Sequence, residues 1–426
     1  MKTPTLWVTT TQLPTYPTIS KDTTSDVVII GAGLTGILSA YQLAKAGKSV
    51  VILEKNSIAD GATHLTTAFL TEIIDTDLAK LIDTFGIEIS KNIIEAHAKA
   101  IELIETIVKE EKIDCNFKRC SNYVYAHSDA AFGNLLGEYD AMATLGIEAH
   151  LSADPLAGFK NFGYIEVYNQ AKFHPIKFIR GVLNVLNKHK VEIYEKSEVD
   201  EIEESSMEAI AKNGKRVSGK WILATTYEPF GQPIGLFFKK GMYTTYVLEA
   251  HVRHQMIREG IYEDTKNPYN YFRIDPAADF DTLIIGGQDH RSEIPIDPEK
   301  NFEALEEYLQ EILEDREYSI VNRWDGPILE SSDGLAFIGP HKNLHIMHAF
   351  GFSGNGMTYA GISASIFHDL ILGKKNKFFE IYRTSRVLGP KAMISKAVDY
   401  GGKFIHGATK NVFRRKKKGK SDNKKA

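Results

Sequence analysis

The chain has few cysteines and no large excess of charge. Only Cys115 and Cys120 occur among 426 residues, and the formal net charge is −4. Two cysteines are too few for a disulfide scaffold or a metal site, and they fit a reducing compartment. The small net charge gives no global attraction to nucleic acid. Residues 1–22 lack both a basic start and an apolar stretch, which argues against a secretory signal. We therefore predict a cytoplasmic protein with no metal site and no nucleic-acid partner.

Long apolar runs are also scarce. Residues 27–44 and 349–367 contain no charged side chain, so each approaches the minimum spanning length of about 18 residues. Both runs contain several glycines and follow a strand, turn and helix order. We therefore expect buried elements of a globular fold, not membrane spans.

The stretch from Val27 to Glu54 reads as strand, turn, helix and second strand. The turn is Gly-Ala-Gly-Leu-Thr-Gly, with its glycines at Gly31, Gly33 and Gly36. In a dinucleotide-binding unit the first glycine permits the tight turn, the second admits a pyrophosphate, and the third lets helix and strand pack closely. Glu54 ends the second strand, where an acid binds the ribose hydroxyls and disfavours a 2′-phosphate. The stretch predicts FAD or NAD, not NADP.

Three later segments carry small or hydroxyl side chains beside predicted strands or helices. They are GATHLTTA at 61–68, the strand WILATT at 221–226 and a second glycine-rich turn, FGFSGNGMT, at 350–358. Taken singly, the first reads as a surface loop and the second as a core strand. After a dinucleotide-binding unit, the first suits phosphate binding. The second places Ala224 and Thr225 where a parallel sheet approaches its cofactor. The third directs helix N–H groups at another anionic centre.

These segments together resemble the D-amino-acid oxidase (DadA-like, glycine oxidase) family of FAD-dependent oxidoreductases. The matching motifs are GAGLTG with Glu54, GATHLTTA, WILATT, IIGGQDH, SSDGLAFIGP and FGFSGNGMTYAG, in that order, across Asp26 to Gly373. The chain is also similar to bacterial relatives that end in a Rieske domain and to γ-glutamylputrescine-oxidase-like enzymes. No cysteine follows residue 373, so no Rieske cluster can form in this chain.

The resemblance implies an α/β fold with a Rossmann-like, glutathione-reductase-type FAD-binding domain. That domain is interleaved with an α+β substrate domain that has a mixed or antiparallel sheet. We expect an N-terminal arm at 1–24, the FAD-binding domain at 25–95, 160–232 and 320–373, the substrate domain at 96–159 and 233–319, and a C-terminal extension at 374–426 with a basic tail.

The resemblance also implies contacts to FAD, which we expect to be non-covalent because neither cysteine lies near a motif that borders the ring. The implied residues are Gly31, Ala32, Gly33 and Gly36 at the pyrophosphate, Glu54 and Lys55 near the ribose, Gly61, Thr63, Thr66, Thr67 and Ala68 from the phosphates toward the ring, Val199 at adenine, Ala224 and Thr225 at the strand end, and Gly351, Phe352, Gly354, Asn355, Gly356 and Met357 at the pyrimidine end.

One departure concerns the substrate. Amino-acid oxidases of this family carry an arginine that pairs with the substrate carboxylate, and Ile328 occupies that position here. We therefore expect oxidation of a C–N bond in an amine or amino-acid-like compound, with hydride transfer to flavin N5 and reoxidation by oxygen or a carrier. The candidates for catalytic or pocket-lining residues are His290, Arg273, Tyr246 and Tyr271, although each is more often structural. Arg291 is a further candidate for the missing arginine.

Two other functions stay open, as does the role of the tail. The chain could be a flavoprotein electron-transfer partner without a small-molecule substrate, or an assembly protein that keeps FAD as structure. Residues 414–418 are Arg-Arg-Lys-Lys-Lys. A disordered solubilising tail is the first interpretation of this cluster, and peripheral binding to anionic lipid is the alternative.

Overall fold

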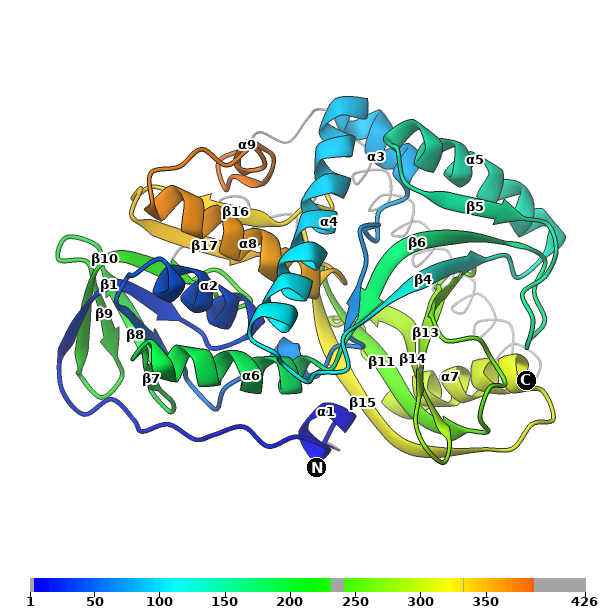
Figure 1. The fold of residues 1–426 in the computed structure, drawn as a ribbon, viewed down its shortest axis with the longest axis horizontal. Coiled ribbons are helices and arrows are strands. Elements are labelled where there is room, and N and C mark those ends of the chain that lie inside the picture. Colours follow the sequence, from blue (N-terminus) through cyan, green and yellow to red (C-terminus); the bar gives the residue numbers. More distant parts are fainter. Residues whose placement is uncertain (1–3, 231–240, 332, 387–426) are drawn as a thin grey trace, which may run out of the picture. The chain divides into compact units, whose positions relative to one another are not determined.

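A computed structural model describes residues 4–230, 241–331 and 333–386. These residues belong to one compact unit that ends at Arg386. The predicted basic tail lies outside the described residues. Two β-sheets organise the unit, and the chain passes between them several times (Figure 1).

Sheet A contains the expected nucleotide-binding strands. Its order is β16-β17-β10-β1-β2-β7, and the β8–β9 hairpin joins through β10. Strands β17, β10, β1, β2 and β7 pair in parallel, whereas β16 and β9 run antiparallel to their neighbours. The bounds are β1 Thr23–Ile30, β2 Val50–Leu53, β7 Glu192–Tyr194, β8 Val199–Glu203, β9 Glu208–Ala211, β10 Arg216–Ala224, β16 Phe337–Pro340 and β17 Ile346–Phe350.

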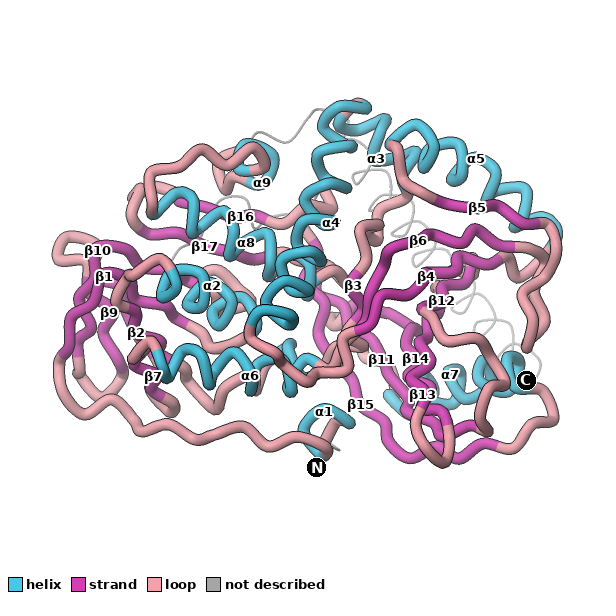
Figure 2. Tube along the Cα trace, in the orientation of Figure 1, coloured by secondary structure: helices cyan, strands magenta, loops and turns pink. Residues whose placement is uncertain are grey.

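Strand β1 is apolar on both faces because both faces of sheet A are covered. Val27 and Ile29 join the large core beneath the helices, and Val28 and Ile30 join a smaller core with Ile19 of the N-terminal arm. This double burial produces the continuous apolar run that is typical of parallel strands. The helices beside sheet A are α2 Leu34–Lys45, α6 Pro175–Lys188 and α8 Gly356–Ile371, and α4 Ile87–Glu110 packs on α8 (Figure 2).

Sheet B is mixed and has the order β15-β11-β14-β13-β12-β4-β6-β3, with β5 paired to β6. Among the described strands of sheet B, only β12 and β4 pair in parallel. Helix α7 Pro298–Leu313 covers one face of this sheet. The bounds are β3 Phe69–Leu70, β4 Lys118–Tyr125, β5 Ala149–Ser152, β6 Tyr164–Lys172, β11 Gly241–Val252, β12 Ile261–Asp264, β13 Asn270–Pro276, β14 Asp281–Arg291 and β15 Tyr318–Glu330.

The remaining elements connect these layers. They are α1 Leu6–Thr9, the 3₁₀ turn Ala62–His64, α3 Leu78–Phe85, α5 Asp129–Leu145 and α9 Phe379–Tyr382. Within the described ranges, every helix is too short or too polar to cross a bilayer. The predicted α/β class, with a parallel nucleotide-binding sheet and a second mixed sheet, is confirmed. Strand β6 and residues 320–330 of β15 lie inside ranges that we assigned to the FAD-binding domain, and both strands pair within sheet B. The domain boundaries stay a prediction.

Candidate active site

The first glycine turn is closed by its own neighbours in sheet A. Gly31 has φ +103°, and an added Cβ would lie 2.7 Å from the Thr225 carbonyl oxygen. A Cβ on Gly36 would lie 2.1 Å from the Gly31 carbonyl oxygen. The Thr225 hydroxyl donates to the Ile30 and Gly31 carbonyls, 3.0 Å away in each case. Ala224 lies opposite Ile30 in the strand register. Sheet and helix therefore approach as closely as the motif requires.

Glu54 is held beside this turn at the end of β2. One carboxylate oxygen accepts from the Ala32 N–H and the other from the Asn56 N–H, both at 2.8 Å. The carboxylate thereby bridges the ends of β1 and β2, which is the position a ribose-binding acid needs. Lys55, the next residue, is exposed.

The loop after β2 reaches the start of α2. The Thr63 hydroxyl accepts from the Leu34 N–H at 3.1 Å, and it would lie 3.2 Å from a Cβ on Gly33. The polar loop predicted to bind phosphates thus lies against the helix terminus predicted to bind them. Gly61 is exposed at its start, Thr66 and Thr67 are partly buried, and Ala68 is buried with φ +61°. Val199 is buried at the beginning of β8, paired with Ala211.

The second glycine turn precedes α8. It contacts the carboxylate of Asp75, which we did not predict from the sequence. Asp75 accepts from the Gly354 N–H at 2.6 Å, and the Asp75 N–H donates to the Asn355 side-chain oxygen at 3.1 Å. Gly351 has φ +74°, and α8 begins at Gly356. Phe352 stacks on Tyr359, and Met357 is buried. No local sequence signal indicates Asp75, because it lies 279 residues from its partner.

Asp75 is accessible to solvent although protein surrounds it. Its side chain is exposed, yet the surrounding protein raises its pKa to about 6, mainly by desolvation, with Glu330 and Asp289 adding repulsion. The carboxyl group is therefore partly desolvated and still open to a ligand.

Further acidic and phenolic side chains lie near Asp75. Burial and the charge of Asp75 raise the pKa of Glu263 to about 7, and burial raises that of Asp289 to about 6. One Asp289 oxygen is buried without a hydrogen-bond partner among the described residues. Burial, and to a lesser extent the same carboxylates, raise the pKa values of Tyr269 and Tyr271. The group contains three neighbouring carboxyl groups, so it suits a cationic ligand better than a carboxylate ligand.

The two faces of sheet B separate the predicted candidates. Tyr271 lies on the face with Asp289, and its hydroxyl is 3.1 Å from the Thr245 hydroxyl. Tyr246 lies on the opposite face, where it stacks on His290 at 5.7 Å and contacts Phe302 of α7. Successive strand residues alternate between faces, which explains why neighbouring residues 289 and 290 separate. Of Tyr246, Tyr271 and His290, the structure therefore brings only Tyr271 near Asp75 and Asp289.

Arg273 is buried in a structural network. It is 1 % exposed, and one guanidinium nitrogen donates to the Thr67, Ala68 and Phe173 carbonyls. The other terminal nitrogen pairs with Asp275 at 2.7 Å. A guanidinium with these partners is poorly placed to receive a substrate carboxylate.

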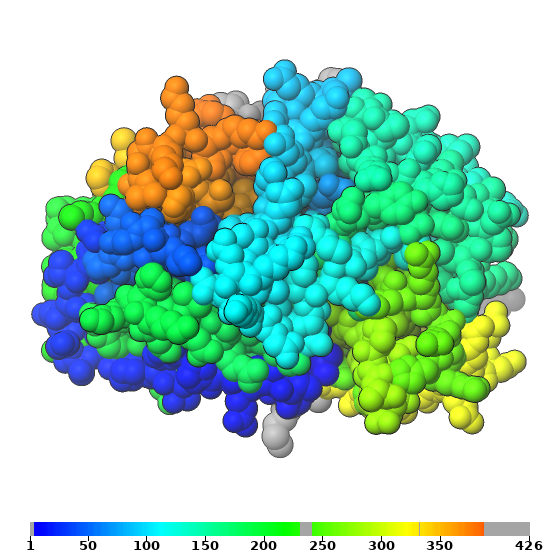
Figure 3. All heavy atoms as spheres, in the orientation of Figure 1, coloured from blue at the N-terminus to red at the C-terminus, as the bar shows by residue number. Residues whose placement is uncertain are grey.

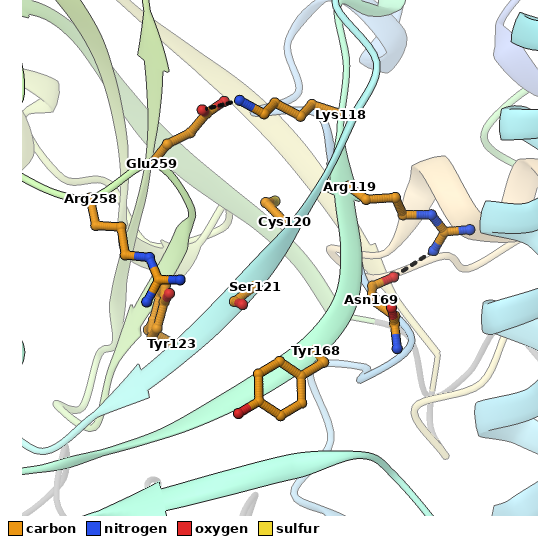
Figure 4. Close-up of a pocket in the computed structure, with 9 residues that line it drawn as sticks. All are labelled: Lys118, Arg119, Cys120, Ser121, Tyr123, Tyr168, Asn169, Arg258 and Glu259. Atoms are coloured by element: carbon orange, nitrogen blue, oxygen red, sulfur yellow. Dashed lines mark hydrogen bonds and ion pairs between the residues drawn. The ribbon is translucent and has the colours of Figure 1, made fainter.

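A separate pocket of about 330 Å³ opens between β4, β6 and the segment before β12 (Figure 4). Lys118 pairs with Glu259, and Arg119 pairs with Glu105 at 2.6 Å. Burial raises the pKa of Cys120 to about 11, which disfavours a reactive thiolate. Its lining includes none of the predicted cofactor residues. It comprises Lys118, Arg119, Cys120, Ser121, Tyr123, Tyr168, Asn169, Arg258 and Glu259.

The residues at sheet A fit a dinucleotide. The glycine cradle leaves no space for a Cβ at Gly31 or Gly36, the α2 terminus supplies N–H groups, and Glu54 is placed for a ribose. The sequence from Asp26 to Leu370 matches the family model described as FAD dependent oxidoreductase (DAO). The chain belongs to this family and is an FAD-dependent oxidoreductase.

Individual relatives agree with the family. The chain is 30% identical to the putative Rieske 2Fe-2S iron–sulfur protein YhfW of Bacillus subtilis over 95% of this chain and 80% of that protein. It is 22% identical to γ-glutamylputrescine oxidoreductase of Escherichia coli, over 85% and 87%. The fold is similar to glycine oxidase from Geobacillus kaustophilus, with a TM-score of 0.71 at 16% identity over 86% and 100% of the chains. The predicted family is confirmed.

Proposed function

We propose that this enzyme oxidises the C–N bond of a cationic amine that lacks a carboxylate beside the reacting carbon. The observation that carries the proposal is the group of neighbouring carboxyl groups of Asp75, Asp289 and Glu263, which have raised pKa values and of which Asp289 has one buried oxygen without a hydrogen-bond partner among the described residues. Ile328 stands where the family's carboxylate-binding arginine is expected, and Arg273 binds backbone carbonyls. The acidic groups would repel a substrate carboxylate and attract an ammonium group.

A bound ammonium group would relieve the repulsion within this cluster. Opposite charge within about 4–6 Å favours the ionised carboxylate, so substrate binding would lower the pKa values of Asp75 and Asp289 and release protons. The reacting amine must be neutral to yield a hydride, and a neighbouring carboxylate can hold the proton that it loses. FAD bound here would supply the hydride acceptor, N5, and pass the electrons to oxygen or a carrier.

The test is anaerobic titration of the purified holoprotein with primary amines, secondary amines, amino acids and NADH, followed by the visible flavin absorption. We expect bleaching by a di- or polyamine class and little bleaching by simple α-amino acids. Preferential bleaching by α-amino acids would contradict the cationic-substrate proposal while leaving the enzyme class intact.

Asp289→Asn gives a second test with the substrate found in that titration. Because the change removes one of the charges proposed to bind the ammonium group, we expect KM to rise by about tenfold or more, with a smaller change in kcat. An unchanged KM would show that Asp289 does not face the substrate.

An electron-transfer flavoprotein is the second candidate function. It is favoured by the similarity to the Bacillus subtilis relative, whose name describes an iron–sulfur protein. In that case no amine would bleach the flavin, whereas dithionite or a reduced iron–sulfur protein would. The same titration therefore distinguishes the two functions.

We also propose, as the alternative to a solubilising tail, that residues 410–426 bind anionic lipid at a membrane surface. The test is co-sedimentation of the full chain, and of a chain ending at Thr409, with liposomes that contain phosphatidylserine. Tighter binding by the full chain is expected at low salt. Equal binding would remove the lipid proposal.

A further inference from the structure

Four consecutive carbonyl groups in the loop after β2 are bound by side chains from elsewhere in the chain. Trp324 of β15 donates its indole N–H to the Leu65 carbonyl at 2.9 Å. Trp7 of α1 donates to the Thr66 carbonyl at 2.7 Å. Arg273 of β13 donates to the Thr67 and Ala68 carbonyls at 3.0 Å. We call residues 65–68 the clamped loop, and these three side chains the clamp.

The clamp is buried, and two of its members, Trp7 and Arg273, contact each other. Trp7 and Arg273 are each 1 % exposed, and the guanidinium lies 5.4 Å from the Trp7 ring centre. His174 packs edge-on against the same indole at 5.0 Å. Hydrogen bonds in such a dry site are expensive to lose, because the carbonyl would stay buried without a partner. The clamp therefore fixes the loop more firmly than exposed contacts could.

Fixing the carbonyls also fixes the direction of the N–H groups. The peptide unit is planar, and in the trans form its C=O and N–H point in opposite directions. Among the described residues only the bond between Asn267 and Pro268 is cis, so the units of the clamped loop are trans. The Leu65 carbonyl points toward Trp324 and the Thr66 carbonyl toward Trp7, so the Thr66 N–H points away from Trp324 and the Thr67 N–H points away from Trp7. A ligand opposite either indole would meet an N–H donor whose direction is already fixed.

The N-terminal arm supplies Trp7, which is one of the three clamp side chains. It follows the edge of the sheet A half, where it forms the dark-blue strip at the bottom of Figure 3. The Thr10 hydroxyl is 2.9 Å from His174, the Tyr16 N–H donates to Glu195 at 2.8 Å, and the Ile19 N–H donates to Ser197 at 3.0 Å. Near its beginning, the Pro4 carbonyl accepts from Asn322 of β15 at 2.5 Å. The arm is thus anchored to both sheets on either side of Trp7.

We propose that Trp7, carried by the docked arm, is a positioning residue for FAD. It holds the Thr66 carbonyl so that the adjoining Thr67 N–H is presented to the flavin, and Arg273 and Trp324 hold the neighbouring units. The proposal rests on the predicted contact between the clamped loop and FAD, and it does not depend on which substrate the enzyme oxidises. Arg273 thereby receives a role in cofactor positioning in place of substrate binding.

The test compares full-length Trp7→Phe with the parent protein. Phenylalanine keeps most of the buried ring but removes the N–H, so the variant loses the hydrogen bond with little loss of packing. We expect FAD to bind about fivefold more weakly to the apoprotein, with a changed visible circular dichroism of the bound flavin. Tyr16→Phe is the matched control: it removes a hydrogen bond of the same arm, to Asn187 at 3.2 Å, and should leave both readouts at parent values.

The readouts separate positioning from simple stability. A lower melting temperature of the Trp7→Phe holoprotein, with unchanged FAD affinity and unchanged flavin dichroism, would overturn the proposal. If Trp7→Phe does not fold, Thr10→Val decides: it keeps the indole but removes the hydroxyl that contacts His174 at 2.9 Å, so α1 holds the indole N–H less firmly against the Thr66 carbonyl. A weaker FAD affinity in Thr10→Val supports the proposal, and parent affinity overturns it. Neither assay uses substrate, so a failed amine titration does not affect the result.

Discussion

The two glycine-rich turns of this enzyme share a strand, turn and helix order but differ in what lies at the helix terminus. At the first turn, the Leu34 N–H of α2 is met by a neutral hydroxyl, Thr63. At the second, the Gly354 N–H before α8 is met by the carboxylate of Asp75. The Leu34 N–H therefore meets no carboxylate, which suits a pyrophosphate, and the nearest acid of this turn, Glu54, accepts from the Ala32 N–H two residues earlier. The second terminus has an acid beside it, so the same motif produces a different electrostatic environment.

Gly36→Ala should have the largest effect, and it acts on the first turn. The new Cβ would lie 2.1 Å from the Gly31 carbonyl oxygen, so strand and helix must separate. Overpacking of this kind costs about 1–3 kcal/mol in ordinary cores, and here it also displaces the turn that is predicted to bind the pyrophosphate. We expect purification without bound FAD, measured as the ratio of absorbance at 450 nm to that at 280 nm.

Gly137→Ala is the control for that change. Gly137 lies within α5, where an added Cβ meets no atom within 4 Å. Alanine is favoured over glycine in helices by about 1 kcal/mol, so this variant should keep its FAD and gain slight stability. Normal FAD content in Gly36→Ala would disprove the close-packing interpretation of the first turn.

Glu54→Ala should weaken FAD binding without abolishing the fold. The carboxylate bonds the Ala32 and Asn56 N–H groups and is placed for the ribose. Hydrogen bonds to charged groups contribute about 1.5–3 kcal/mol, so we expect FAD affinity to fall by roughly ten- to a hundredfold. Fluorescence titration of the apoprotein measures this change. Glu204→Ala, at an exposed position of the same sheet region, should retain parent affinity.

The glycine spacing and the acid of the first turn could be predicted from sequence because these residues lie close together in the chain. Gly31, Gly36 and Glu54 lie within a single strand, helix and strand unit, and the spacing alone sets their geometry. Asp75 could not be predicted as the partner of Gly354, because tertiary packing of segments 279 residues apart brings them together. The clamp was missed for the same reason: Trp7 reaches Thr66 across 59 residues.

Asp75→Asn tests the acidic environment of the second turn through the pH dependence of protein stability. Desolvation, with repulsion from Glu330 and Asp289, raises the Asp75 pKa from 3.8 to about 6, although the Gly354 N–H opposes the shift. The folded state thus favours the protonated acid. Its contribution to stability is full below pH 4 and is lost as pH rises through about 6. Because asparagine cannot ionise, the variant should be more stable than the parent above pH 7. We expect a gain of about 1 kcal/mol, which is less than the full pKa shift would give because the Asp75 side chain is exposed to solvent.

Urea unfolding at pH 4.5 and pH 8 measures this difference. The two stability curves should approach each other at the lower pH and separate at the higher one. Asp140→Asn, at an exposed position on α5, should show no comparable pH-dependent gain. A gain of equal size at both pH values would indicate that the effect does not come from ionisation of Asp75.

The faces of sheet B could not be assigned from sequence either. The pattern around residues 286–290 predicts a strand end near the substrate, but alternation alone does not say which side the substrate occupies. Packing of Tyr246 and Phe302 fixes the answer, since these rings place His290 on the α7 side. Asp289, which is not among the predicted catalytic candidates, lies on the opposite face with Tyr271.

His290→Asn should therefore have the smallest effect. A general base typically contributes 10²- to 10⁴-fold to the rate, so loss of a catalytic His290 would be obvious. We expect kcat/KM for the responsive amine to change by less than about threefold, because hydride loss from a neutral amine needs no strong base and because the imidazole stacks on Tyr246, on the face opposite Asp289. Steady-state kinetics beside Asp289→Asn make the comparison direct, since the two residues adjoin in sequence and lie on opposite faces of sheet B. A loss of a hundredfold or more in His290→Asn would place the substrate on the α7 side of sheet B and would exclude a substrate site at Asp75.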